Sequence, residues 1–181
     1  MRRESRAMIT IVIRGVIVGF LLALLLIAAG AYWYFGSGMA PVATSSPPMP
    51  FEKFLANRAL HVVVAKAANQ PSPVDASETN LRAGAALYRD NCAVCHGLPG
   101  EAETNIAKGM FPKVPQLFQG KGVTDDPVGE TFWKVKNGIR LSGMPSFQGS
   151  LSDTEMWQAT QLLANAGKLP ESAANELKQK H

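Results

Sequence analysis

The stretch that decides the fold is RDNCAVCHGLPG, residues 89–100. It contains both cysteines of the 181-residue chain, Cys92 and Cys95, and one of its three histidines, His96. Two thiols separated by two residues make a poor structural crosslink, and such pairs more often serve redox, metal or cofactor chemistry. The sequence therefore indicates that these three side chains form a chemical site.

Cys-x-x-Cys-His is the attachment pattern for c-type haem, in which each thiol forms a thioether and the adjoining histidine binds the iron. A structural zinc site needs four ligands, and only His61 and His181 remain elsewhere to complete one. A thioredoxin-like pair requires a βαβ pattern that the sequence lacks, and a chance adjacency is the last alternative. We therefore expect one covalently bound haem c, with its iron, at Cys92, Cys95 and His96.

The N-terminal region predicts a membrane span. Residues 15–35, GVIVGFLLALLLIAAGAYWYF, carry no charge, and a helix needs about 20 apolar residues to cross the hydrocarbon core. The arginines of residues 1–14 predict a cytoplasmic N-terminus, and the aromatic residues 32–35 suit the far interface. The rest of the chain would then face the periplasm of a bacterium. A cleaved signal peptide is the alternative, since AGA at 29–31 resembles a cleavage site.

The charge distribution argues against a nucleic-acid partner. The formal net charge is +4, and four arginines and one glutamate before residue 15 account for three of those charges. The remainder of the chain is close to neutral, whereas nucleic-acid binding needs a basic face on the folded domain.

Residues 36–79 are expected to be a linker, because Gly, Ser and Pro dominate its first part. Within it, residues 51–68 space apolar side chains by three and four, which predicts an amphipathic helix. The β-branched run 62–64 weakens that prediction. Packing against the main domain is its simpler role. The alternative is contact with the membrane through its basic residues, which are Lys53, Arg58 and Lys66.

The main domain is expected over residues 80–170, with helices over 81–91 and from near residue 127 to residue 137. A final helix follows, for which Ser152 and Glu155 form a capping-box pattern. Residues 171–181 are expected to be a polar tail. About 90 residues with helices at both ends make a thin core, so we expect a bound group to fill its centre.

Four motifs occur together in this domain: GAALYRDNCAVCHG, then PQL, then FWKVKNGIRLSGMPSF, and a C-terminal helix. Over residues 80–168 they resemble class I cytochromes c of the bacterial membrane-anchored kind. The resemblance implies an all-α, small cytochrome c fold around one covalently bound haem, preceded here by one N-terminal transmembrane helix. It also implies that the first helix of the domain packs on the last, through Gly84 and Tyr88 facing Trp157 and Leu162.

The resemblance also implies roles for individual residues. Cys92 and Cys95 would be the covalent attachments, His96 the proximal ligand and Met144 the distal ligand. The carbonyl of Pro115 would accept the proximal imidazole NH and so orient the ring.

Several alternatives remain open at this site. Pro112 is near enough in sequence to replace Pro115, and Met110 is the other methionine that could serve as distal ligand. Met144 is favoured because Gly143 and Pro145 hold it in a loop. Trp133 and Arg140 are expected to contact the haem or its propionates, the alternatives being a core tryptophan and a solvent-facing arginine.

The sequence thus predicts an electron carrier that is not itself an enzyme, anchored to the bacterial cytoplasmic membrane with a periplasmic haem domain. Its expected partners are membrane-bound redox proteins, such as a quinol-oxidising complex and a terminal oxidase. One alternative is an electron-transfer subunit of a separate dehydrogenase or reductase. Another is a haem sensor whose sixth position is open to a small gas.

Overall fold

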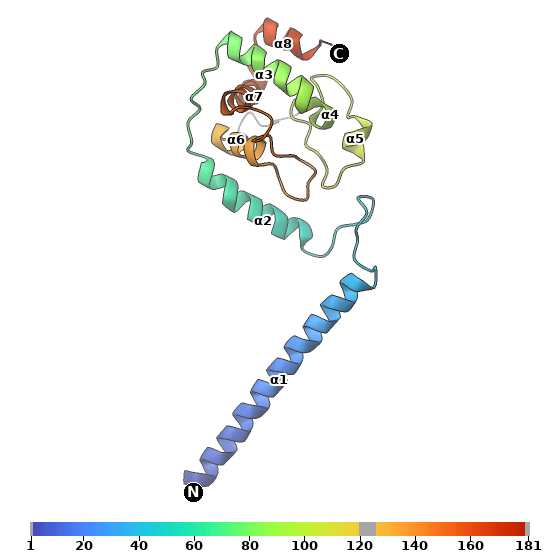
Figure 1. The fold of residues 1–181 in the computed structure, drawn as a ribbon, viewed down its shortest axis with the longest axis vertical. Helices are drawn as coiled ribbons and strands as arrows, with labels where there is room; N and C mark the ends of the chain where they lie inside the picture. The colour runs from blue at the N-terminus through green and yellow to red at the C-terminus, as the bar shows by residue number, and fades with distance from the viewer. Residues whose placement is uncertain (1, 120–125, 180–181) are drawn as a thin grey trace. The chain divides into compact units, whose positions relative to one another are not determined.

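The computed structural model describes residues 2–119 and 126–179, with side chains from residue 8 onward. The chain divides into two compact units, Met1–Met49 and Pro50–His181. Within the described residues every regular element is a helix, and the one β-type pairing there is an isolated bridge between Ile139 and Met144. The expected all-α class is confirmed (Figure 1).

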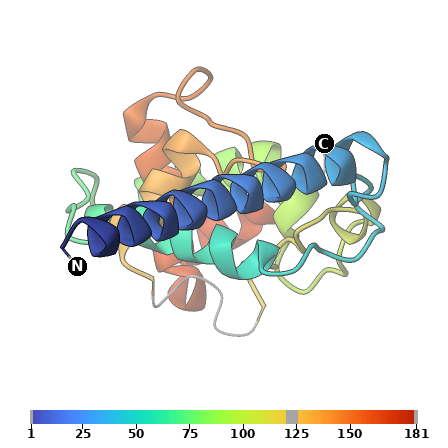
Figure 2. The ribbon, with the colours of Figure 1, turned by 90° about the horizontal axis from the view of Figure 1, so that it is seen from below.

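The first unit is built on α1, a continuous helix over Arg2–Gly36 (Figures 1 and 2). Its segment Met8–Gly36 has 29 residues and a mean hydropathy of 2.8. Length and composition are those of a membrane-spanning helix, and a signal sequence near the N-terminus has the same properties.

The second unit contains the remaining helices. Three of them, α3, α6 and α7, lie where the sequence predicts helices. The one clear difference is that α3 begins three residues earlier than predicted. The helices are α2 (Glu52–Val64), α3 (Glu78–Asn91), α4 (Ala93–His96), α5 (Asn105–Lys108), α6 (Val128–Asn137), α7 (Asp153–Ala164) and α8 (Glu171–Leu177), with single 3₁₀ turns η1 (Ala65–Ala67) and η2 (Ala166–Lys168).

The start of α7 follows from its sequence. The Ser152 hydroxyl accepts a hydrogen bond from the Glu155 amide at 3.3 Å, and the Glu155 carboxylate accepts one from the Ser152 amide at 2.8 Å. This reciprocal pair satisfies two amides that the helix itself leaves unpaired. The predicted capping box is confirmed.

The crossing of α3 and α7 forms the centre of the domain. Gly84 lies where the two helices meet, and a Cβ atom there would collide with the Gln158 carbonyl oxygen. Tyr88 and Leu162 share one buried cluster, as expected, but Trp157 belongs to a second cluster. There its indole stacks on Phe132, with ring centroids 3.9 Å apart.

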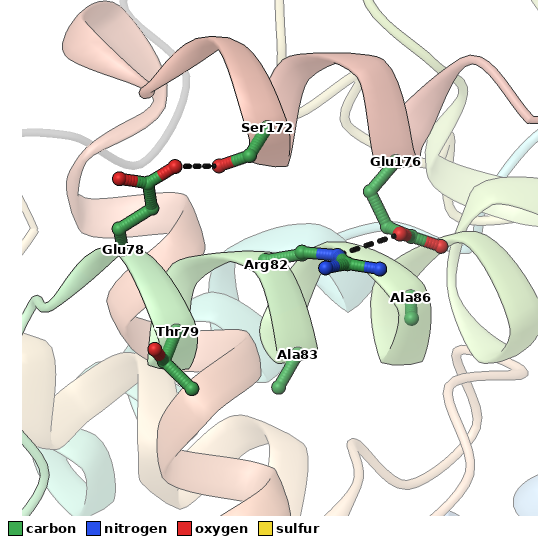
Figure 3. A pocket seen from close by; sticks show the side chains of 7 residues that line it. All are labelled: Glu78, Thr79, Arg82, Ala83, Ala86, Ser172 and Glu176. Carbon is green, nitrogen blue, oxygen red and sulfur yellow. Dashed lines mark hydrogen bonds and ion pairs between the residues drawn. The ribbon is translucent and has the colours of Figure 1, made fainter.

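The prediction of a polar tail over residues 171–181 is wrong for residues 171–177, which form α8 and pack on α3. Ala173 and Leu177 are buried in the same cluster as Tyr88. The carboxylate of Glu176 pairs with Arg89 at 2.8 Å and with Arg82 at 3.2 Å, and these two ion pairs offset the cost of burying it. Figure 3 shows the pair with Arg82. Residues 180 and 181 of the predicted tail, and with them His181, lie outside the described residues.

The predicted linker over residues 36–79 is also partly wrong, because α2 and η1 within it belong to the second unit. Val64 is buried, and the carbonyl of Ala67 lies so close to Gly129 of α6 that a Cβ atom there would collide with it. Packing against the main domain, the simpler role expected for residues 51–68, is therefore confirmed for the end of this stretch.

Candidate haem-binding site

The two cysteines and the histidine lie on one helical turn. Cys92 lies between α3 and α4 and caps both, and its carbonyl accepts hydrogen bonds from the amides of Cys95 at 3.1 Å and His96 at 2.9 Å. Residues three and four positions apart on a helix lie on the same face. The sequence spacing therefore places two thiols and an imidazole side by side.

The imidazole of His96 is held by a backbone carbonyl. Its Nδ1 lies 2.9 Å from the Pro115 oxygen, and because a carbonyl can only accept, Nδ1 carries the proton and donates. The lone pair is then on Nε2, which is the atom left to bind a metal. Of the two candidate prolines, Pro115 makes this bond.

Burial lowers the pKa of His96, against the opposing effect of its hydrogen bond to Pro115. The neutral imidazole is therefore favoured, and the neutral form is the one that coordinates iron.

Hydrogen bonds to two successive carbonyls, those of His96 and Gly97, hold the end of this helical turn in place. The Tyr88 hydroxyl donates to the Gly97 oxygen at 2.8 Å, and the Leu117 amide donates to the His96 oxygen at 3.3 Å. Burial, followed by the nearby Cys92, raises the pKa of Tyr88, so its hydroxyl keeps the proton that it donates. The backbone of the motif is thus fixed from both α3 and the segment around residue 115.

Gln116 is a residue that sequence reasoning missed at this site. Its side-chain amide nitrogen lies 3.2 Å from the Cys95 carbonyl and donates to it, while its Oε1 is buried without a partner among the described atoms. Gly97, at a φ of 73°, leaves the room that this side chain occupies. The sequence feature that could have indicated this role is the position of Gln116 directly after Pro115, in the PQL motif.

Cys92 and Cys95 form no disulfide with each other, and both side chains are partly buried. Burial, with a smaller effect of the neighbouring Cys95, raises the pKa of Cys92 to about 12. The surroundings of Cys92 thus disfavour a thiolate and suit an uncharged sulfur. A thioether is such a sulfur, so the thiol environment fits covalent attachment of haem.

Met144 lies in a tight loop between α6 and α7. Gly138 and Gly143 both have positive φ, at 67° and 79°, and the Ile139 amide donates to the Met144 carbonyl at 3.2 Å. After Met144 the chain returns to α6, where the Phe147 amide donates to the Val135 carbonyl at 3.2 Å. The loop thereby satisfies carbonyls at the end of α6 and fixes the position of Met144.

Met110, the competing distal ligand, packs beside this loop. Its terminal methyl lies 2.5 Å from where a Cβ atom on Gly143 would be, so both methionines belong to one region of the domain. Both side chains are partly buried, but Met144 packs against the second buried cluster.

The arrangement of the core fits a flat apolar group. The buried side chains form two separate clusters; Cys92 packs against one and Met144 against the other. A haem disc attached at the first cluster and ligated from the second would join them, which matches the thin core expected from the sequence. The buried members of the first cluster are Leu81, Ala85, Tyr88, Ala93, Leu117, Leu162, Leu163, Ala173 and Leu177, and those of the second are Phe132, Val135, Met156 and Trp157.

The remaining predicted residues are placed as follows. Trp133 is partly buried on α6, and its carbonyl accepts a hydrogen bond from the Asn137 side chain at 2.9 Å. Arg140 is exposed in the loop before Met144, and His61 is exposed on α2. Haem contacts of Trp133 and Arg140 stay predictions.

Residues 2–119 and 126–179 contain no ligand set for zinc. No three His, Cys, Asp or Glu side chains lie close enough together there to hold a metal ion.

A protein-family model described as cytochrome c oxidase, cbb3-type, subunit III matches residues 79–163. This stretch runs from the start of α3 to the end of α7 and contains the motif, Pro115 and Met144. Residues 79–163 are a c-type cytochrome domain. Such a domain carries covalently bound haem c with its iron and serves haem-based electron transfer, as the resemblance implied.

The cytochrome domain also resembles part of a known enzyme. Over 96 residues the chain is 32% identical to the quinohemoprotein alcohol dehydrogenase ADH IIB of Pseudomonas putida. The match covers 52% of this chain but 12% of that enzyme, so the likeness concerns a small part of the enzyme. No solved structure matches the chain. Helices α2 and α8 pack on the cytochrome domain from outside the family match.

Proposed function

We propose that this chain is a single-haem electron carrier anchored to the bacterial cytoplasmic membrane by its N-terminal helix. Residues 15–35 would span the bilayer, and the cytochrome domain would lie in the periplasm. The absence of charge from that span and the arginines before it support the anchor and its orientation.

The observation that carries the proposal is the helical turn at Cys92. It presents both thiols and the His96 ring on one face, and Pro115 leaves Nε2 of that ring unprotonated. Cys92 and Cys95 would form the two thioethers, and His96 would be the proximal ligand. Haem c held there supplies reversible one-electron chemistry at its iron.

Met144 would be the distal ligand. Its loop is fixed by hydrogen bonds within the loop and to α6, so the thioether needs little reordering to be presented. Histidine with methionine fills the coordination sphere and raises the reduction potential relative to bis-histidine ligation. A filled sphere favours electron transfer over gas binding, which is why a gas sensor is the weaker reading. Trp133 and Arg140 would border the haem and its propionates.

The partners would be membrane-bound redox proteins, with a quinol-oxidising complex upstream and a terminal oxidase downstream. Anchoring raises the local concentration of the domain near such partners without any new contact. The second candidate function is an electron-transfer subunit of a separate dehydrogenase or reductase. The likeness to one segment of a quinohemoprotein dehydrogenase favours it, and co-purification with a catalytic subunit would support it over the free carrier.

The test is an optical spectrum of the purified chain in both oxidation states, with and without carbon monoxide. Low-spin spectra in both states and no change with carbon monoxide are expected for an iron held by His96 and Met144. A high-spin spectrum that shifts with carbon monoxide would instead favour the sensor.

A further inference from the structure

Helix α2 packs on the cytochrome domain near its C-terminal end and leaves most of its length exposed. Its inner side packs on the cytochrome domain, where Val64 is 1% exposed and Leu60 is partly buried. Its outer side leaves Phe54 67% and Leu55 62% exposed. Leu55 and Val64 are nine residues apart, which is two and a half helical turns, so they lie on opposite sides of the helix.

The outer side carries a continuous apolar stripe. Phe54, Leu55, Ala59 and Val62 follow one another at spacings of one, four and three residues, and all four are exposed. Phe51, directly before the helix, is exposed as well. Such spacing gathers side chains along one side of a helix. Exposed aromatic and aliphatic side chains in a row cost free energy in water, which indicates that another surface covers them.

The charges of this segment fit an anionic surface. Arg58 and Lys66 are exposed, and Glu52 is the one acidic residue between positions 51 and 68. Lys53 is a further exposed basic residue, but its ammonium lies 5.9 Å from the centre of the Phe111 ring and so stays on the cytochrome domain. Apolar side chains flanked by lysine and arginine are the pattern of helices that lie in the headgroup region of a bilayer, where basic groups meet anionic lipids.

The position of α2 in the chain favours the bilayer over another protein. Helix α1 ends at Gly36 and α2 begins at Glu52, so 15 residues separate them. Fully extended, such a segment spans at most about 50 Å. A helix on such a tether stays within about 50 Å of the membrane span, so the bilayer is a surface that it meets at high local concentration.

We infer that the outer side of α2 lies in the headgroup region of the membrane that α1 spans, with anionic lipid as its partner. The inference rests on the proposed anchor. Because the inner side of α2 and the following turn η1 pack on α6, this contact fixes the orientation of the cytochrome domain on the membrane. Helix α6 leads directly into the Met144 loop, so the same contact decides which side of the domain meets membrane-bound partners.

The test uses the full-length holoprotein in phosphatidylcholine vesicles with and without phosphatidylglycerol. Leu55→Cys carries a nitroxide spin label, and Asn175→Cys, exposed on α8, is the matched control. Helix α8 packs on α3, on the side of the domain away from α2 (Figure 1). The unsubstituted holoprotein is the labelling blank, since thioether sulfurs take no label.

We expect the Leu55 label to collide several-fold less often than the Asn175 label with a water-soluble nickel chelate, and more often with dissolved oxygen. The difference should shrink without phosphatidylglycerol. Adding Phe54→Ser and Val62→Ser should return the Leu55 label toward the values of the control. Both added positions are exposed, so the fold should survive.

Three results would overturn the inference. Equal nickel accessibility of the two labels, in a chain that floats with the vesicles, would refute the α2 contact and leave the anchor standing. Shielding from both nickel and oxygen, with dipolar broadening, would show that a second copy covers α2. A chain that fails to float would refute the anchor and the α2 contact together, while its haem spectrum would still test the site separately.

Discussion

His96 and Met144 show what single residues contribute to this domain. The ring of His96 is oriented by one carbonyl, that of Pro115, and Met144 is held by a loop that folds back onto α6. The proposed ligands therefore need little rearrangement, and substitution of either should change the iron's surroundings more than the fold.

Met144→Ala should open the sixth position of the iron. The expected results are a low midpoint potential, loss of the weak far-red band that a thioether gives ferric haem, and new reactivity with carbon monoxide. Redox titration and optical spectra measure all three.

Met110→Ala is the matched control, because Met110 packs beside the same loop. It should leave all three observables nearly unchanged. The reverse pattern would transfer the ligand role to Met110, and insensitivity to both substitutions would point to His61.

The sequence could predict much of this site but not all of it. The spacing of Cys92, Cys95 and His96 is local, so a single helical turn brings the three side chains together without contacts from the rest of the chain. The partner of His96 was expected only by resemblance, because a contact between residues 96 and 115 depends on how the intervening segment folds. Gln116 was missed for the same reason, since nothing local to it shows that it reaches the Cys95 carbonyl.

At the scale of elements, the crossing of α3 and α7 supports the domain. Gly84→Ala should destabilise it, because the new Cβ atom would collide with the Gln158 carbonyl on α7. Overpacking of this kind costs typically about 1–3 kcal/mol. Denaturant unfolding of the holoprotein, followed by haem absorbance, reports on this domain and not on α1.

Gly149→Ala serves as the control for this substitution, since a Cβ atom there would meet nothing within 4 Å. It should leave the unfolding midpoint close to that of the unsubstituted protein. If Gly84→Ala were equally harmless, the close crossing would be wrong.

The docking of α8 on α3 should depend on pH. Hydrogen bonds from Arg89 and then Arg82 lower the pKa of Glu176 below its ordinary value of 4.5. A lowered folded-state pKa contributes stability above the ordinary pKa, and that stability is lost as pH falls through the folded-state value. Glu176→Gln should therefore lower the unfolding midpoint at neutral pH, and the difference should close in strong acid.

Glu171→Gln is the control on the same helix, because Glu171 is exposed. Denaturation curves at neutral and acid pH compare the two substitutions. If the unfolding midpoint of Glu176→Gln differed from that of the unsubstituted protein by the same amount at every pH, lost packing and not the ion pair would explain the effect.

The elements differ in how far local sequence determines them. The start of α7 was predictable because its capping box is made by residues three apart, Ser152 and Glu155. Helix α8 was not, because ESAANEL reads as a polar segment. Its burial depends on Arg82 and Arg89, which lie 94 and 87 residues before Glu176 and supply the charges that make a buried Glu176 acceptable.

At the scale of the whole molecule, the proposed anchor makes a claim about topology. A reporter enzyme that is active only outside the cytoplasm, fused after His181, should be active in a bacterial host. The same reporter placed before Met1, with the whole chain retained after it, should be inactive, because the arginines of residues 1–14 keep that end inside. Activity of this N-terminal fusion with loss of the His181 fusion would invert the proposed orientation.

The mass of the purified, denatured chain tests the central claim most directly. If Cys92 and Cys95 hold the haem covalently, the chain of 19.4 kDa should appear with the added mass of one haem after unfolding and removal of free cofactor. A chain that begins near Tyr32 but keeps the haem would replace the anchor by a signal peptide and leave the site intact. The mass of the bare polypeptide, from a host that attaches haem to c-type cytochromes, would contradict the account.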